Sequence, residues 1–189
     1  MRLNSLPLLE ELIQLSLAGK QTVLRFKNMD ANQLNFKPNE KSWSILECIE
    51  HLNLYGDFYL PEMEKQILAA SKTRPKVEFK TGVLGGYFAN LMREKNGKIK
   101  KMKSPKDKNP TNSTLTITSL DRFLKQQSLL ISLLEQAKQV DLTKTKTAIS
   151  ISSFIKLRIG DTFRFYVYHI ERHLNQAKKL ELLLTKPVH

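Results

Sequence analysis

The sequence predicts an all-α fold, a four-helix bundle with a long irregular insertion between its second and third helices. Three observations predict it. Four long segments carry apolar residues at helical spacing, approximately over residues 6–28, 44–70, 119–139 and 160–185. The stretch 72–117 has no such regularity. A chain of 189 residues, 41% hydrophobic and 26% charged, also fits one domain, which we assign to 1–189.

The first predicted helix runs from Leu6 to about Asn28. Its apolar residues form one stripe at helical spacing: Leu6, Leu9, Ile13, Leu17 and Leu24. Residues 28–41 contain several Asn and Asp residues and Pro38, so they are expected to form a loop.

The second helix is predicted to start after Ser44. Ser44 and Glu47 have the spacing of a capping box, in which the serine oxygen accepts from the third helical amide and the glutamate reaches back. The helix should run to about Ala70. Because Pro61 lies inside it, we expect a kink or a local break near residues 59–60.

The insertion and the last two helices follow. The segment GVLGGYFANLMREK favours a short amphipathic helix, although its three glycines weaken it, and residues 76–80 and 113–118 have some strand character. The insertion either covers one end of the bundle and shapes substrate access or is a mobile surface loop. The third helix is predicted over 119–139. The fourth runs over 160–185, with Asp161 or Thr162 as cap and Pro187 preventing continuation.

Composition excludes several classes of protein. No apolar run approaches the length needed to span a bilayer, and the segment after Met1 lacks the apolar core of a signal peptide. The single cysteine, Cys48, excludes an internal disulfide, so a cytoplasmic location is expected.

The net charge is +13, but the lysine-rich segment 95–108 (KNGKIKKMKSPKDK) has no aromatic residue and no arginine. Nucleic-acid binding is therefore not favoured.

Three histidines are candidate metal ligands. His169 and His173 are spaced i, i+4 in YHIERHLNQ, which places both rings on one face of the fourth helix. A metal ion bound by imidazoles needs a third ligand from elsewhere, and His51 in the second helix is the internal candidate, since His189 is the last residue. The pattern does not match a zincin helix, because Glu171 lies about 200° round the helix from His169 and points away.

Two segments resemble a known family. The segment KSWSILECIEHLNLYGDFY looks like the DinB-like superfamily signature, and LRIGDTFRFYVYHIERHLNQAKKL resembles that family's last helix with its HxxxH pair. The two segments cover under a third of the chain. The resemblance implies an up-down-down-up bundle, a divalent metal site (Ni or Zn) at His51, His169 and His173, and frequent dimerisation. It also implies thiol-dependent S-transferase, hydrolase or isomerase activity, although many members have no assigned reaction.

Other residues near the histidines have alternative interpretations. For Cys48 a small buried apolar role is favoured over metal binding. Tyr55 either lines a pocket or packs in the core, and Gln176 either orients a metal ligand or is a solvated or interhelical amide. We expect Trp43 to anchor the start of the second helix in the core, and Glu47 to serve as a cap and not as an acid or base.

The sequence leaves two classes of function open. The leading hypothesis is a metal-dependent enzyme, a hydrolase or a thiol S-transferase, acting on a small-molecule substrate that includes a low-molecular-weight thiol in the second case. The alternative is a non-enzymatic basic helical module that binds an anionic partner through its lysines. No general base is evident in the sequence, and the sequence does not choose between the two reactions.

Overall fold

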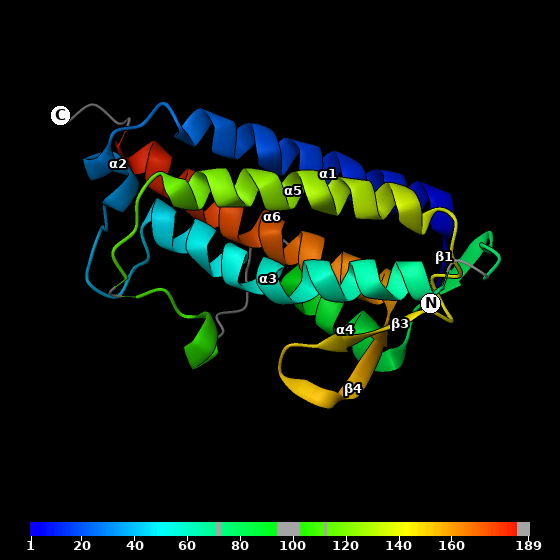
Figure 1. Cartoon of the computed structure of the whole chain (residues 1–189). Helices are drawn as coiled ribbons and strands as arrows, with labels where there is room; N and C mark the ends of the chain where they lie inside the picture. The colour runs from blue at the N-terminus through cyan, green and yellow to red at the C-terminus, as the bar shows by residue number, and fades with distance from the viewer. Residues whose placement is uncertain (71–72, 94–102, 112, 185–189) are drawn as a thin grey trace.

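The computed structural model describes residues 1–70, 73–93, 103–111 and 113–184, and the protein is mostly helical. Four long helices lie side by side and form the body of the molecule (Figure 1). The elements follow in the order β1 (Arg2–Asn4), α1 (Ser5–Phe26), α2 (Ala31–Asn35), α3 (Ile45–Ala69), β2 (Glu78–Lys80), α4 (Val83–Met92), η1 (Lys106–Lys108), α5 (Thr118–Ala137), β3 (Lys146–Ile149), β4 (Ser152–Arg158) and α6 (Ile159–Leu184).

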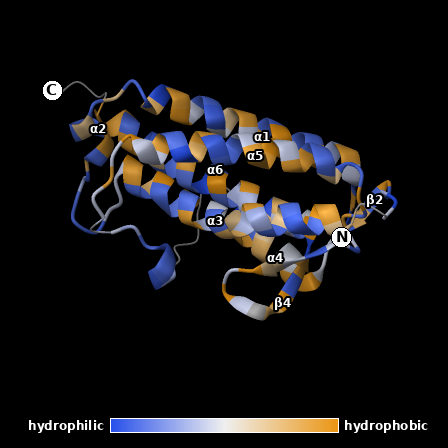
Figure 2. Cartoon of the chain, in the orientation of Figure 1, coloured by the Kyte–Doolittle hydropathy of each residue, from blue (hydrophilic) through white to orange (hydrophobic). Residues whose placement is uncertain are grey.

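The long helices enclose one hydrophobic core. Both α1 and α3 pack against α5 and α6, and α4 packs against α6. Hydrophobic and hydrophilic residues alternate in bands along α1 and α5, as amphipathic helices require (Figure 2). The inward residues are almost fully buried, among them Leu12, Val23, Ile49, Leu130 and Phe163. Among the described residues, no helix combines the length and the hydrophobicity needed to cross a bilayer.

The boundaries of the four long helices agree with the sequence to within a few residues. The predicted break in the second helix is wrong, because α3 continues from Ile45 to Ala69 with Pro61 inside it. Proline removes one helical hydrogen bond, but Tyr59, Leu60 and Met63 around it are buried in the core. Their packing outweighs the local cost of the proline.

Two small sheets were not part of the predicted all-α fold. In the first, β1 pairs antiparallel with β2, with Leu3 opposite Phe79. This confirms the strand character of residues 76–80, whereas 113–118 form no strand in the described part of the chain. In the second, β3 and β4 form an antiparallel hairpin with Thr147 opposite Leu157. This hairpin lies next to α4 and α6 (Figure 1).

The short helix predicted in the insertion is confirmed as α4. Its glycines, which weaken the helix locally, have a packing role. A Cβ atom on Gly85 would lie 2.6 Å from Cβ of the buried Asp161 on α6. Only glycine therefore lets α4 approach α6 this closely.

The predicted cap of α6 at Thr162 or Asp161 is wrong, because the helix begins at Ile159, two residues before Asp161. The Asp161 carboxylate instead accepts the N–H of Gly82 at 2.7 Å, the hydroxyl of Thr81 at 2.6 Å and Nη1 of Arg164 at 3.1 Å. Gly82 is the residue that precedes α4. Asp161 thus joins the start of α4 to the start of α6.

Candidate metal centre

The start of α3 sets the position of His51. Ser44 Oγ accepts the N–H of Glu47 at 3.2 Å, and Glu47 Oε2 accepts the N–H of Ser44 at 2.9 Å, which confirms the capping box. Lys37 Nζ also lies 2.6 Å from Glu47 Oε1. Both oxygens of the Glu47 carboxylate therefore have partners, in agreement with the capping role predicted for this residue. His51 follows on α3 and is almost fully buried.

The structure brings the three predicted histidines together. His51 of α3 faces His169 and His173 of α6, and one ligand nitrogen from each ring lies within 4.8 Å of the others. The two Nε2 atoms of His51 and His169 are 3.2 Å apart. Two nitrogens bound to one ion at about 2.0 to 2.1 Å lie about 2.9 to 3.4 Å apart at octahedral to tetrahedral angles. The three-imidazole donor set therefore fits a divalent metal ion, and the separation of the His51 and His169 nitrogens is already that of two ligands of one ion.

Hydrogen bonds orient two of the three rings. His51 Nδ1 donates to the backbone carbonyl of Lys108 at 2.6 Å, and His173 Nδ1 donates to Gln176 Oε1 at 3.1 Å. With the proton held on Nδ1, each Nε2 carries a lone pair that is available to a metal ion. The alternative of Gln176 as a ligand-orienting amide is thus supported. His169 Nδ1 is buried and has no hydrogen-bond partner among the described residues.

Burial keeps the three imidazoles neutral. Desolvation lowers the pKa of His51 to about 4 and that of His173 to about 3. Desolvation, followed by the neighbouring His173 and His51, also lowers the pKa of His169 well below its usual value. Neutral imidazole is the form that binds metal, so no histidine has to lose a proton before a cation binds at physiological pH.

We expect the stability of the metal-free protein to fall as the pH drops below about 6.5. The unfolded chain takes up protons on its histidines near pH 6.5, whereas folded His51 and His173 do so only near pH 4 and 3. The histidine contribution is therefore complete above pH 6.5 and is lost toward pH 3. Each histidine adds a slope of up to about 1.4 kcal/mol per pH unit. Urea unfolding in EDTA from pH 7.5 to 4 measures this, and a flat profile would contradict it.

Two groups at the site were missed by the sequence analysis. The Lys108 carbonyl that orients His51 comes from the insertion, and Ser104 Oγ lies 3.4 Å from His51 Nδ1. Trp43 packs against the core as expected, but it is only half-buried and also lies beside the histidines, with its ring centroid 4.7 Å from that of His51 and 5.7 Å from that of His173. The described part of the insertion therefore covers this site. Most of the segment 95–108, and His189, lie outside the described residues.

The remaining candidate residues follow the expectations. Cys48 is fully buried, burial raises the pKa of its thiol, and it is not part of the histidine cluster. Tyr55 lines the cavity, with its ring centroid 5.0 Å from His51 and 4.5 Å from His169. Glu171 faces a different cavity, as its position on the helix predicted.

The histidines open onto a cavity of about 700 Å³. Its walls come from α3, α4, α6, the β3–β4 hairpin and the insertion. In the described part of the chain, the lining contains five aromatic side chains apart from the histidines: Trp43, Tyr55, Tyr59, Phe88 and Phe165. A cavity of this size holds a small molecule, and its open side lets that molecule reach the histidine nitrogens.

Comparison with known proteins agrees with this arrangement. The family model of the DinB superfamily matches residues 14–177, which include all three histidines. No curated protein matches the chain, and no solved structure matches it. Because the family match extends over most of the sequence, the chain belongs to the DinB superfamily.

Proposed function

We propose that the protein is a metal-dependent enzyme, a hydrolase or a thiol S-transferase, in which His51, His169 and His173 hold one divalent ion, Ni or Zn. The convergence of three neutral imidazoles, two buried and the third partly buried, at the wall of a cavity carries this proposal. Membership of the DinB superfamily supports it. Isolated histidine pairs on helices are common, but a third ring from another helix at ligand distance is not expected by chance.

When bound, a divalent ion supplies a Lewis acid that lowers the pKa of a water molecule or of a substrate thiol. The chain's own residues orient and enclose that site. The Lys108 carbonyl and Gln176 hold the protons of His51 and His173 on Nδ1. Burial raises the pKa of Tyr55 to about 12, so its hydroxyl remains a neutral hydrogen-bond donor beside the histidines. The aromatic side chains make much of the wall beside the histidines apolar.

No carboxylate is present among the described residues that line the cavity. A side-chain carboxylate as general base is therefore not part of the proposal. Hydrolysis and thiol transfer both fit, because both take their nucleophile from a group whose pKa is lowered at the metal site. For thiol transfer the partner is a low-molecular-weight thiol.

We also propose that the long helices follow the up-down-down-up order of the DinB-like fold. Contacts between helix ends support it. Lys27 after α1 pairs with Asp121 at the start of α5, so α1 and α5 are antiparallel. Arg25 near the end of α1 pairs with Glu181 near the end of α6, so these two are parallel. The side-chain amide of Asn53, in the first half of α3, donates a hydrogen bond to the Ser119 carbonyl at the start of α5, so α3 and α5 are parallel.

Metal analysis of protein purified without a polyhistidine tag tests the proposal. We expect about one equivalent of Ni or Zn per chain, because a three-imidazole site retains its ion through purification. Protein without metal that also fails to take up Zn in equilibrium dialysis would contradict the proposal. In that case, binding of a polyanion with strong salt dependence would favour the basic binding module.

A further inference from the structure

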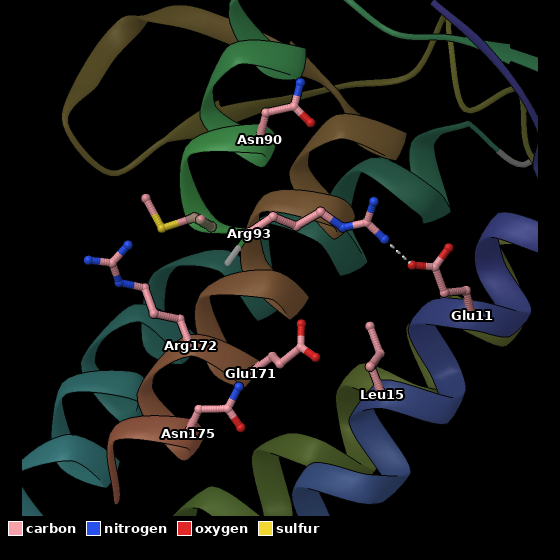
Figure 3. Close-up of a pocket in the computed structure, with 8 residues that line it drawn as sticks. Glu11, Leu15, Asn90, Arg93, Glu171, Arg172 and Asn175 are labelled. Atoms are coloured by element: carbon pink, nitrogen blue, oxygen red, sulfur yellow. Dashed lines mark hydrogen bonds and ion pairs between the residues drawn. The ribbon is translucent and has the colours of Figure 1, made fainter. Parts of the chain in front are cut away.

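Among the residues that the structure describes, the charged side chains lining the histidine cavity all have the same sign. They are Lys41, Lys103, Arg172 and Lys179. The neighbouring cavity of about 440 Å³, between α1, α4 and α6, has a balanced lining (Figure 3). In this second cavity, Glu11 of α1 pairs with Arg93 at 2.6 Å, and Glu171 of α6 lines the cavity as well (Figure 3). Since the two cavities are adjacent and differ in charge, the positive lining is a property of the histidine cavity and not only of the basic chain.

The lining along α6 changes from apolar to cationic. Phe165, His169, His173, Gln176 and Lys179 all face the cavity. Their spacing of i, i+4, i+8, i+11 and i+14 places them on one face of the helix, over a length of about 21 Å. The aromatic ring stands at one end of this row and the lysine at the other. The two predicted metal ligands lie between them.

Other elements extend both ends of this row. At the apolar end, the ring centroids of Tyr59 and Phe88 lie 5.6 Å and 6.4 Å from that of Phe165. Ile149 and Leu157 of the β3–β4 hairpin line the cavity as well. The opposite end receives Lys41, which comes from the loop that leads into α3, two residues before Trp43. The ring of Trp43 is in turn near His173.

The two lysines at the cationic end are available to a ligand. Lys41 and Lys179 are exposed, and neither forms an ion pair with a carboxylate among the described residues. An incoming anion would therefore not have to displace an internal acid from them. Ammonium groups at the rim of a low-dielectric cavity attract anions more strongly than those on an open surface.

We infer that the substrate carries an anionic group that binds at the Lys41 and Lys179 end and an apolar group of aromatic size that binds at the Phe165 end. Its reacting atom lies between these groups, at the histidines. This inference rests on the proposed function, because the histidines define where the reaction takes place. For a thiol transferase, the anionic group and the apolar group would belong to the two substrates, the thiol and its acceptor, one at each end.

Binding of a bipartite probe to the full-length, metal-loaded protein tests the inference. The probe is phenylhexyl sulfonate, whose sulfonate and phenyl ring are joined by a hexyl chain; sulfonates are weak metal ligands. Hexyl sulfonate lacks the ring, and phenylhexyl methyl sulfone lacks the charge. By calorimetry at low salt, we expect the full probe to bind at least about fivefold more tightly than either partial probe.

Paired variants locate the two ends. The Lys41→Gln/Lys179→Gln variant should lose at least about fivefold in sulfonate affinity and keep its affinity for the neutral sulfone. The matched control, Lys125→Gln/Lys178→Gln, removes the same charge from α5 and α6 outside the cavity lining and should stay within about twofold. Phe165→Ala should weaken the sulfonate and the sulfone alike.

Absence of sulfonate binding to the unmodified protein, or an equal loss in both lysine variants, would overturn the inference. The same samples are analysed for metal, which separates this result from the proposed function. Neither Lys41 nor Lys179 belongs to the histidine cluster, so both lysine variants should retain the metal. A normal metal content without charge-dependent binding would reject the substrate class alone, and protein that binds no metal would reject the proposed function.

Discussion

Replacing His169 with alanine is expected to lower the affinity for divalent metal by more than about a hundredfold. Loss of a residue that only hydrogen-bonds to a metal ligand already lowers metal affinity by about 10–100-fold, and His169 would be a ligand itself. His169 is one of the two buried rings of the cluster and lies close to both of the others. Its ring centroid lies 5.0 Å from that of His51 and 4.7 Å from that of His173. Its removal leaves two imidazoles, from different helices. Equilibrium dialysis against Zn, with metal determined by mass spectrometry, measures the loss.

Two further variants make this result interpretable. His169 is buried, so its truncation leaves a cavity and lowers the free energy of unfolding. His173 is less buried, and His173→Ala should lose metal to a similar extent at a smaller cost in stability. Gln176→Ala removes only the partner of His173 Nδ1 and should reduce the affinity by about 10–100-fold. A folded His169→Ala variant that still bound one equivalent of metal would show that the site assignment is incorrect.

The pair His169 and His173 was predictable from a local sequence rule, whereas His51 was assigned as the remaining internal histidine and by the resemblance to the DinB-like superfamily. The spacing of His169 and His173 fixes their common helix face, and the capping residues Ser44 and Glu47 fix where α3 begins and thus where His51 falls. Amphipathic periodicity gave the four long helices for the same reason. These features repeat within one helical turn, so a single sequence suffices to find them.

What sequence reasoning missed depends on contacts between distant residues. Lys108 acts on His51 through its backbone carbonyl, which every residue type has, so no side chain signals the contact. In β3 of the hairpin, Thr147 and Ile149 are buried at alternate positions, a pattern of period two that was a possible signal. In β4, by contrast, residues 154–156 are exposed in succession before the buried Leu157. The turn of the hairpin at Ser150–Ile151 lacks the Asn-Gly or Gly signal of tight hairpins, and the strands are short.

Replacing Asp161 with alanine is expected to lower the free energy of unfolding by about 3 to 5 kcal/mol, the cost of breaking a buried ion pair by removing one partner. Asp161 and Arg164 are 3.1 Å apart, with side-chain exposures of 0% and 2%. Without the carboxylate, the guanidinium keeps its charge in a buried position, and the Gly82 N–H and the Thr81 hydroxyl lose their acceptor. Urea unfolding at pH 7 measures the change.

An exposed ion pair provides the matched control. Asp57 pairs with Arg122 at the surface of α3 and α5, so Asp57→Ala should cost less than about 1 kcal/mol. The double variant Asp161→Ala/Arg164→Met removes both buried charges and should recover part of the loss. Equal effects of Asp161→Ala and Asp57→Ala would contradict the role of burial.

Asp161 also affects the histidine cavity, because it joins the starts of α4 and α6, and α4 brings Phe88 and Met92 to that cavity. Loss of the Asp161 carboxylate should therefore also weaken the binding of apolar probes beside the histidines.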